Sequence, residues 1–265
     1  HFKVIGKTAW EKFDEVFSLI ENAVLEKLPI SIDFSPYERT GSSLYMLLPE
    51  WVVRNGKRDI LHVIKDIHEK RNIIDYFKSL TLHYDKITVA SALHDKNSIG
   101  KTISEISSKT ELSPEEVMLN LIDLNELNVS VFSEAINKVH VEELLKKPYA
   151  YLSTDGAGYD LNDPSNNSYD MLNSKLVNEE NYTHPRSFGT FPKVFKEFVR
   201  ERNIITMGEA VYKSSFMPAK IMGLEDRGDL KEGYFADIAV LDLQKTEDLA
   251  DYKNPFQSIN WSLHN

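Results

Sequence analysis

The stretch "PISIDFSPY", residues 29–37, decides the fold class of this chain. Its β-branched residues follow a proline and predict a short strand. Ahead of it, residues 9–28 place apolar side chains at helical spacing, and the chain opens on "HFKVIG", residues 1–6. The order strand, helix, strand predicts an α/β fold with a parallel sheet.

The same mixture of helices and strands continues along the chain. Residues 43–85 have a mostly helical pattern, and Ser113-Pro114-Glu115-Glu116 is the capping signature of a further helix. More strands are predicted at "KITVASAL" (86–93), "NVSVFSEA" (128–135), "PYAYLSTDG" (148–156) and "GYFADIAVLDL" (233–243), and more helices at 136–147, 191–202 and from Thr206 to about Gly223. Residues 158–183 are rich in Asn, Asp, Ser and Tyr, which predicts a long loop.

Composition limits the classes of function. The 265 residues are 42% hydrophobic, which is enough for a large core, and carry a formal charge of −10. Acidic and basic residues are interspersed, which argues against nucleic acid or an anionic membrane as a partner. Without cysteine the chain can form no disulfide and no thiolate zinc site, so a metal would need His and carboxylate ligands. No run approaches about 20 apolar residues and no targeting signal is evident, so we expect a cytoplasmic protein.

Asp155, in "YLSTDGAGYD" (151–160), is the first candidate for catalysis. It follows a predicted strand, and the carboxyl ends of parallel strands are where α/β folds collect catalytic groups. A carboxylate there can bind a divalent metal and take a proton from water, as amide hydrolysis requires. The alternative is that Asp155-Gly156 is an ordinary turn.

Two further stretches add candidates. In "HFK", His1 could offer an imidazole to a metal and Lys3, on the same side of an extended chain, a cation. In "HPRSFGTFP" (184–192), the guanidinium of Arg186 could bind a carboxylate through two hydrogen bonds. The alternatives are an exposed terminus and a surface loop.

The succession of "HFK", "DFSPY", "STDG", "HPRSFGTFPKVFKEFVRE" and "GLEDRGDLKEGYFADIAVLD" resembles the C-terminal portion of the N-acyl-D-amino-acid deacylases, or D-aminoacylases, of the amidohydrolase superfamily. The resemblance implies part of a zinc-dependent TIM-type (β/α) barrel beside a small β-sandwich, hydrolysing an N-acyl-D-amino acid to a carboxylate and a D-amino acid. Residues 1–222 would then supply barrel strands six to eight, with an insertion at about 38–127, and residues 223–265 part of the sandwich.

The resemblance also implies roles for individual residues. His1 matches a zinc ligand, and Asp155 matches the metal-binding aspartate that activates water and passes its proton to the leaving amine. Lys3 and Arg186 match the groups that hold the substrate's α-carboxylate. Tyr37 matches the second tyrosine of a "YPY" motif, whereas Ser35 replaces the first, which leaves the preferred substrate side chain open.

The family motifs that would complete a site for one or two zinc ions are a His-x-His pair, a cysteine and another histidine, and they do not occur in this sequence. We therefore expect the chain to be inactive without a complementary N-terminal half. Two other interpretations stay open. One is a non-catalytic α/β remnant that binds a partner or a carboxylate ligand through Lys3 and Arg186. The other is a different amidohydrolase, such as a dihydroorotase-like cyclic amidase.

Overall fold

The computed structural model describes residues 1–54, 56–156 and 182–255 and the backbone of 262–264. The chain has an α/β fold and divides into two compact units. Unit 1 comprises His1–Glu38, Ile136–Gly156 and His184–Asn265, and unit 2 comprises Arg39–Ala135 and Ala157–Thr183. Almost all of the predicted loop 158–183 lies outside the described residues. The barrel and sandwich boundaries expected from the sequence stay predictions.

Unit 1 is built on a two-stranded parallel sheet. Strand β1 (Ile32–Phe34) pairs with β5 (Ala150–Leu152), and the pairing is parallel, the direction expected for the sheet. Beyond the strands, Ser153 N–H donates to the carbonyl of Phe34 at 3.0 Å. On the other side of β1, the Phe2 N–H donates to the carbonyl of Asp33 at 2.7 Å. The ends of three segments that are distant in sequence therefore lie side by side.

The opening segment differs from the expected strand. Among the described residues, its β-pairing is limited to Ile5, which forms an isolated antiparallel bridge with Ile136. Since β5 already pairs with one edge of β1, the hydrogen bond from Phe2 marks the other edge.

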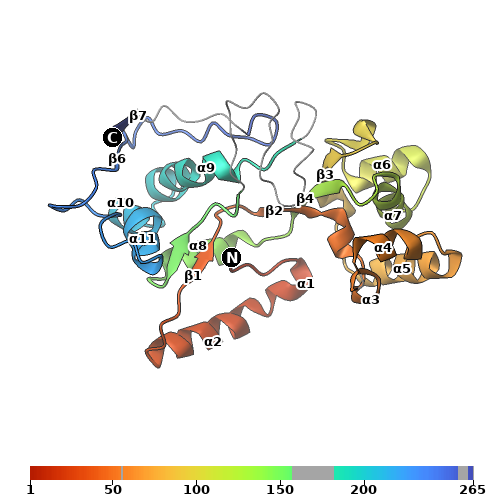
Figure 1. The fold of residues 1–265 in the computed structure, drawn as a ribbon, viewed down its shortest axis with the longest axis horizontal. Helices are drawn as coiled ribbons and strands as arrows, with labels where there is room; N and C mark the ends of the chain where they lie inside the picture. The colour runs from red at the N-terminus through yellow and green to blue at the C-terminus, as the bar shows by residue number, and fades with distance from the viewer. Residues whose placement is uncertain (55, 157–181, 256–261, 265) are drawn as a thin grey trace. The chain divides into compact units, whose positions relative to one another are not determined.

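Helices cover the sheet of unit 1 (Figure 1). They are α1 (Lys7–Trp10), α2 (Phe13–Leu25), α8 (Lys138–Lys146), α9 (Arg186–Lys193), the π-helical η4 (Val194–Glu201), α10 (Met207–Val211), the π-helical η5 (Tyr212–Phe216) and α11 (Met217–Ile221). Phe13 and Phe17 of α2, Phe34 of β1, Leu145 of α8 and Phe198 of η4 share one buried cluster. Each such side chain contributes about 1.5–3 kcal/mol by leaving water, so this cluster fixes the helices on the sheet.

The predicted helix at 191–202 begins earlier and changes form part-way. Pro192 lies inside α9 and has no amide proton to continue the helical ladder. The wider π-helical turn follows directly, from Val194 to Glu201. A capping box of Thr206 and Glu209 starts the next helix at the predicted position.

Unit 2 contains an antiparallel sheet in the order β2 (Arg39–Ser43), β4 (Val129–Glu134), β3 (Ile87–Ala92). Its helical segments are η1 (Leu44–Leu47), α3 (Glu50–Val53), α4 (Lys57–Val63), α5 (Ile67–Ser79), η2 (Tyr84–Lys86), η3 (Lys96–Ser98), α6 (Ile103–Thr110) and α7 (Pro114–Leu124). The capping box of Ser113 and Glu116 starts α7, as predicted. Strands β3 and β4 were found at the expected positions, but the expectation of parallel pairing is wrong for them. The apolar pattern of a strand predicts which residues are buried, such as Val89 and Val131. It does not predict whether the strand pairs parallel or antiparallel with its neighbour.

The C-terminal strand is shorter than expected. Strand β6 (Ile238–Val240) pairs antiparallel with β7 (Ser262–His264). All three β6 side chains are exposed.

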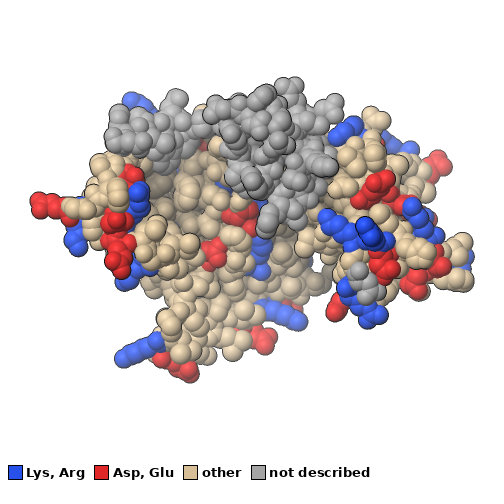
Figure 2. Space-filling model, in the orientation of Figure 1, with Lys and Arg blue, Asp and Glu red and all other residues tan. Residues whose placement is uncertain are grey.

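On the face drawn in Figure 2, Lys and Arg are interspersed with Asp and Glu over the described residues. Among the described helices, none is both long and apolar enough to span a bilayer.

Candidate active site

Asp155 lies just beyond the carboxyl end of β5, in unit 1. Its backbone is left-handed, with φ of 49°, a conformation that Asp adopts more readily than most residues. Thr154 supports the turn by accepting a hydrogen bond from Gly156 N–H at 3.1 Å. The Asp-Gly turn and the candidate carboxylate are therefore the same feature, since the turn places the side chain at the end of the sheet.

Three cationic or basic groups converge on Asp155. Oδ1 lies 3.1 Å from Nε2 of His1, while Oδ2 accepts from Nζ of Lys3 at 2.7 Å and from Nη1 of Arg186 at 2.8 Å. His1 and Lys3 stand on one side of the extended opening segment, and Arg186 is the first residue of α9. The Asp155 and Arg186 side chains are 19% and 16% exposed, so their pairing is partly shielded from water. These four sequence-predicted residues are brought together.

The second nitrogen of His1 is held by two residues that the sequence analysis did not select. Nδ1 contacts Oδ2 of Asp33 and lies 2.9 Å from Oγ of Ser153, which itself donates to the same Asp33 oxygen at 2.7 Å. If Asp33 accepts from Nδ1–H, a neutral imidazole carries its lone pair on Nε2, the nitrogen that faces Asp155. The criterion that selected Asp155, a carboxylate after the end of a strand, does not select Asp33, because Asp33 lies within β1.

The contact between His1 and Asp155 requires a positive charge. A neutral Nε2 and an ionised carboxylate are both acceptors, so at 3.1 Å they need a proton or a metal ion to share. Two ligands of one zinc ion, each at about 2.0–2.2 Å, lie roughly 3–3.5 Å apart. The pair therefore fits two positions of a zinc site. A zinc ion takes about four ligands, and the described residues contain no group of three His, Cys, Asp or Glu arranged to hold a metal.

Comparison with known proteins identifies the family. The model of the Amidohydrolase family matches residues 94–257, which is more than half of the chain. The chain belongs to the amidohydrolase family. This agrees with the resemblance seen in the sequence motifs.

Curated relatives of this amidohydrolase match over shorter stretches. An N-acyl-D-glutamate deacylase and a D-aminoacylase of Alcaligenes xylosoxydans xylosoxydans are 36% and 35% identical over 85 residues, 32% of this chain and 17% and 18% of theirs. A dihydroorotase of Lactobacillus gasseri is 30% identical over 66 residues, which is 24% of this chain and 16% of the dihydroorotase.

Solved structures share the fold over nearly the whole chain. N-acyl-D-glutamate deacylase from Bordetella bronchiseptica, complexed with zinc and a phosphonate inhibitor, gives a TM-score of 0.68 at 18% identity over 97% of this chain. A D-aminoacylase gives 0.67 at 20% identity over 100%. This amidohydrolase covers 42% and 43% of those two chains, so it spans less than half of their length.

Tyr37 lies in the interior of unit 1, next to α9. Tyr37 is 7% exposed, and its hydroxyl lies against Gly189 of α9 without a hydrogen-bond partner among the described residues. Oδ1 of Asp248 faces the same glycine and is also buried, and the part of the chain that the structure describes gives it no hydrogen-bond partner. Burial raises the pKa of both the Tyr37 hydroxyl and the Asp248 carboxyl. Among the described residues no hydrogen bond joins Tyr37 to the His1, Lys3, Asp155 or Arg186 side chains, so its substrate-binding role stays a prediction.

Ser35 is half-buried. Its hydroxyl is buried and has no hydrogen-bond partner within the described ranges of the chain.

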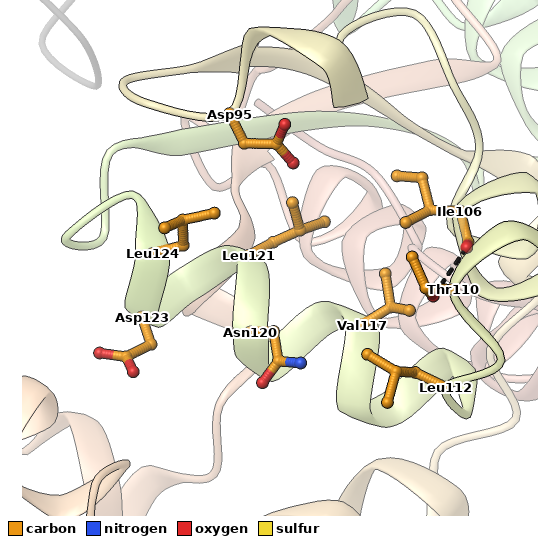
Figure 3. Close-up of a pocket in the computed structure, with 9 residues that line it drawn as sticks. All are labelled: Asp95, Ile106, Thr110, Leu112, Val117, Asn120, Leu121, Asp123 and Leu124. Carbon is orange, nitrogen blue, oxygen red and sulfur yellow. Dashed lines mark hydrogen bonds between the residues drawn. The ribbon is translucent and has the colours of Figure 1, made fainter.

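Unit 2 has a separate cavity of about 400 Å³ between α6 and α7 (Figure 3). Figure 3 shows Leu121 and Leu124 along α7, with Asp95 above them and Asp123 at the edge. The Asp95 side chain accepts from Ser98, and Asp123 lies 3.8 Å from Nζ of Lys65. The walls are mainly apolar and the carboxylates are engaged, so this cavity offers less for hydrolysis than the Asp155 cluster does.

Proposed function

We propose that this amidohydrolase contributes half of a zinc-dependent active site that hydrolyses the amide bond of N-acyl-D-amino acids. The observation that carries the proposal is the convergence of His1, Lys3 and Arg186 on the carboxylate of Asp155. Two of the curated relatives, named as an N-acyl-D-glutamate deacylase and a D-aminoacylase, support this substrate class.

His1 and Asp155 would hold the metal in this proposal. Nε2 of His1 is directed by the Asp33 carboxylate on Nδ1, and Oδ1 of Asp155 faces it. The remaining donors would come from a complementary N-terminal half. Zinc, when bound, polarises the scissile carbonyl and makes a water molecule acidic enough to attack it.

Asp155 would carry the proton. Its carboxylate takes a proton from the attacking water as the water oxygen bonds to the carbonyl carbon. It then delivers that proton to the amide nitrogen as the C–N bond breaks, leaving a carboxylic acid and a free amine. Asp155 ends as it began, so one carboxylate serves as both base and acid.

Lys3 and Arg186 would hold the substrate's α-carboxylate. Each places one donor on Oδ2 of Asp155, yet an ammonium has three donors and a guanidinium has five. Two positive charges beside one carboxylate leave the cluster able to accept a second anion. A substrate carboxylate there would lie next to the catalytic carboxylate, as hydrolysis of an α-amido acid requires.

The fold proposal follows from the sheet of unit 1. The opening segment, β1 and β5 lie side by side, and we propose that they are strands six, seven and eight of a (β/α) barrel. Unit 2 is then the inserted segment. The exposed β6 belongs to the flanking sandwich.

A second candidate function is cyclic-amide hydrolysis, which the dihydroorotase relative favours. The deciding assay uses the chain with zinc, alone and together with a separately expressed N-terminal half of a related deacylase. Release of free D-amino acid from N-acyl-D-glutamate and N-acyl-D-methionine, dependent on zinc, supports the first function. Ring opening of dihydroorotate without D-amino acid release supports the second. Retention of the substrate without turnover in either assay contradicts both and favours a carboxylate-binding module.

A further inference from the structure

We infer that His184 is a positioning residue that fixes the guanidinium of Arg186 on Asp155, by accepting a hydrogen bond from the Arg186 main chain. The inference rests on the proposed function, which assigns Arg186 its substrate-binding role. The sequence motifs had assigned no role to His184.

The hydrogen bond lies at the start of α9. Nδ1 of His184 accepts from the N–H of Arg186 at 3.2 Å. The first amides of a helix have no acceptor inside the helix, and Pro185, the residue before Arg186, has no side chain that could cap it. The His184 ring therefore takes the place of a capping side chain.

The Arg186 peptide is held from its other side as well. Its carbonyl accepts from Oγ1 of Thr190 at 2.7 Å. The main chain at Arg186 is thus fixed by one side chain before it and one after it. Since the guanidinium stands at the far end of a long side chain, a small rotation at this main chain would move Nη1 away from Oδ2 of Asp155.

The His184 ring cannot turn easily. It is 7% exposed and packs edge-to-face against Tyr37, with ring centroids 4.9 Å apart and planes at 87°. On another side lies Tyr252, at 5.2 Å and 66°. Tyr37 follows β1, so the ring links the end of the sheet to the start of α9. The buried Tyr37 then holds the His184 ring in place, a role that does not require contact with substrate.

The chemistry of the ring specifies the test. A nitrogen that accepts a hydrogen bond carries no proton, so the neutral His184 bears its proton on Nε2. Asparagine can place its amide oxygen near the position of Nδ1 and is a favoured capping residue. Phenylalanine keeps the aromatic packing and removes the acceptor. His184→Asn and His184→Phe therefore separate the hydrogen bond from the ring.

The first measurement does not depend on activity. In the ¹⁵N-arginine-labelled chain, the side-chain signal of Arg186 is assigned by its loss in Arg186→Lys, and its hydrogen exchange with water is followed. We expect slow exchange in the parent and in His184→Asn, and fast exchange in His184→Phe. Unchanged exchange in His184→Phe, or loss of slow exchange in His184→Asn alone, would overturn the inference.

The second measurement uses the zinc-loaded enzyme completed by the N-terminal half. His184→Phe should raise KM for an N-acyl-D-amino acid by about 10- to 100-fold and change kcat much less, because a displaced Arg186 weakens binding of the α-carboxylate. KM for the matching α-carboxamide, which lacks that charge, should stay the same, and His184→Asn should resemble the parent. A purely structural cap would affect both substrates equally, which would overturn the inference. If the parent turns over neither substrate, the proposed function fails while the exchange measurement still decides on His184.

Discussion

Oδ1 of Asp155 lies 3.1 Å from Nε2 of His1, although the two residues stand far apart in the sequence. The parallel pairing of β1 with β5 and the hydrogen bond from Phe2 to Asp33 bring them together. The pair is the part of the site on which metal binding and proton transfer both depend. It also explains why Asp33 belongs to the site, since Asp33 determines which imidazole nitrogen faces Asp155.

Replacing Asp33 by asparagine should weaken metal binding. The carboxylate on Nδ1 directs the lone pair of His1 Nε2 outward, and losing such a partner typically costs about 10–100-fold in metal affinity. Zinc affinity is measured by competition with a chromophoric chelator in the enzyme completed by the N-terminal half. Asp85→Asn, which removes an exposed carboxylate in unit 2, is the matched control for charge. Equal zinc affinity in the Asp33 variant and the control would contradict the assignment.

Alanine at Gly189 should destabilise the protein. A Cβ there would lie 2.5 Å from the Tyr37 hydroxyl oxygen and 2.7 Å from Oδ1 of Asp248. The clash should cost about 1–3 kcal/mol, more than the gain in helix propensity of about 1 kcal/mol. Urea unfolding measures the net loss. At Gly208 of α10 a Cβ would meet nothing within 4 Å, so Gly208→Ala should raise the free energy of unfolding. If the free energy of unfolding changed in the same direction in both variants, the result would contradict the packing around Tyr37.

Because of Lys213, the free energy of unfolding should change with pH in the alkaline range. Its side chain is 3% exposed, and Nζ donates to the carbonyls of Lys147 and Ala150. Burial lowers the pKa of Lys213 to about 8, whereas that of an unfolded lysine is about 10.4. Between these values the unfolded chain binds more protons, so the free energy of unfolding rises with pH.

The comparison that isolates this effect is Lys213→Met. The difference in unfolding free energy between the parent and the variant should increase from pH 8 to pH 10.4 by up to about 3 kcal/mol, because methionine binds no proton. Denaturant titrations at several pH values measure it. A difference that stays constant over this range would show that Lys213 keeps an ordinary pKa in the folded protein.

The sequence predicted the elements of the fold better than their arrangement. Capping residues act locally, so the starts of α7 and α10 at Ser113 and Thr206 could be predicted. Strand direction depends on which strands meet, and the antiparallel pairing of β3 with β4 was therefore missed. Pro192 was a visible signal for the change in helix form after α9.

Only part of the site was predicted, and the reason is similar. Motifs identified the residues whose side chains meet at Asp155. They did not identify Asp33, Ser153 and His184, because these residues act by orienting other side chains. Such a role becomes visible only when the strand ends are placed side by side.

The most direct test of the account is the rate of D-amino acid release by Asp155→Asn in the zinc-loaded enzyme completed by the N-terminal half. Asparagine tolerates the left-handed backbone at this position and keeps the shape of the side chain, so the variant removes chiefly the charge and the base. The account predicts a fall in kcat of about 10²–10⁴-fold, with the parent's free energy of unfolding largely retained. A variant that releases D-amino acid within a few-fold of the parent rate would show that Asp155 does not carry the proton.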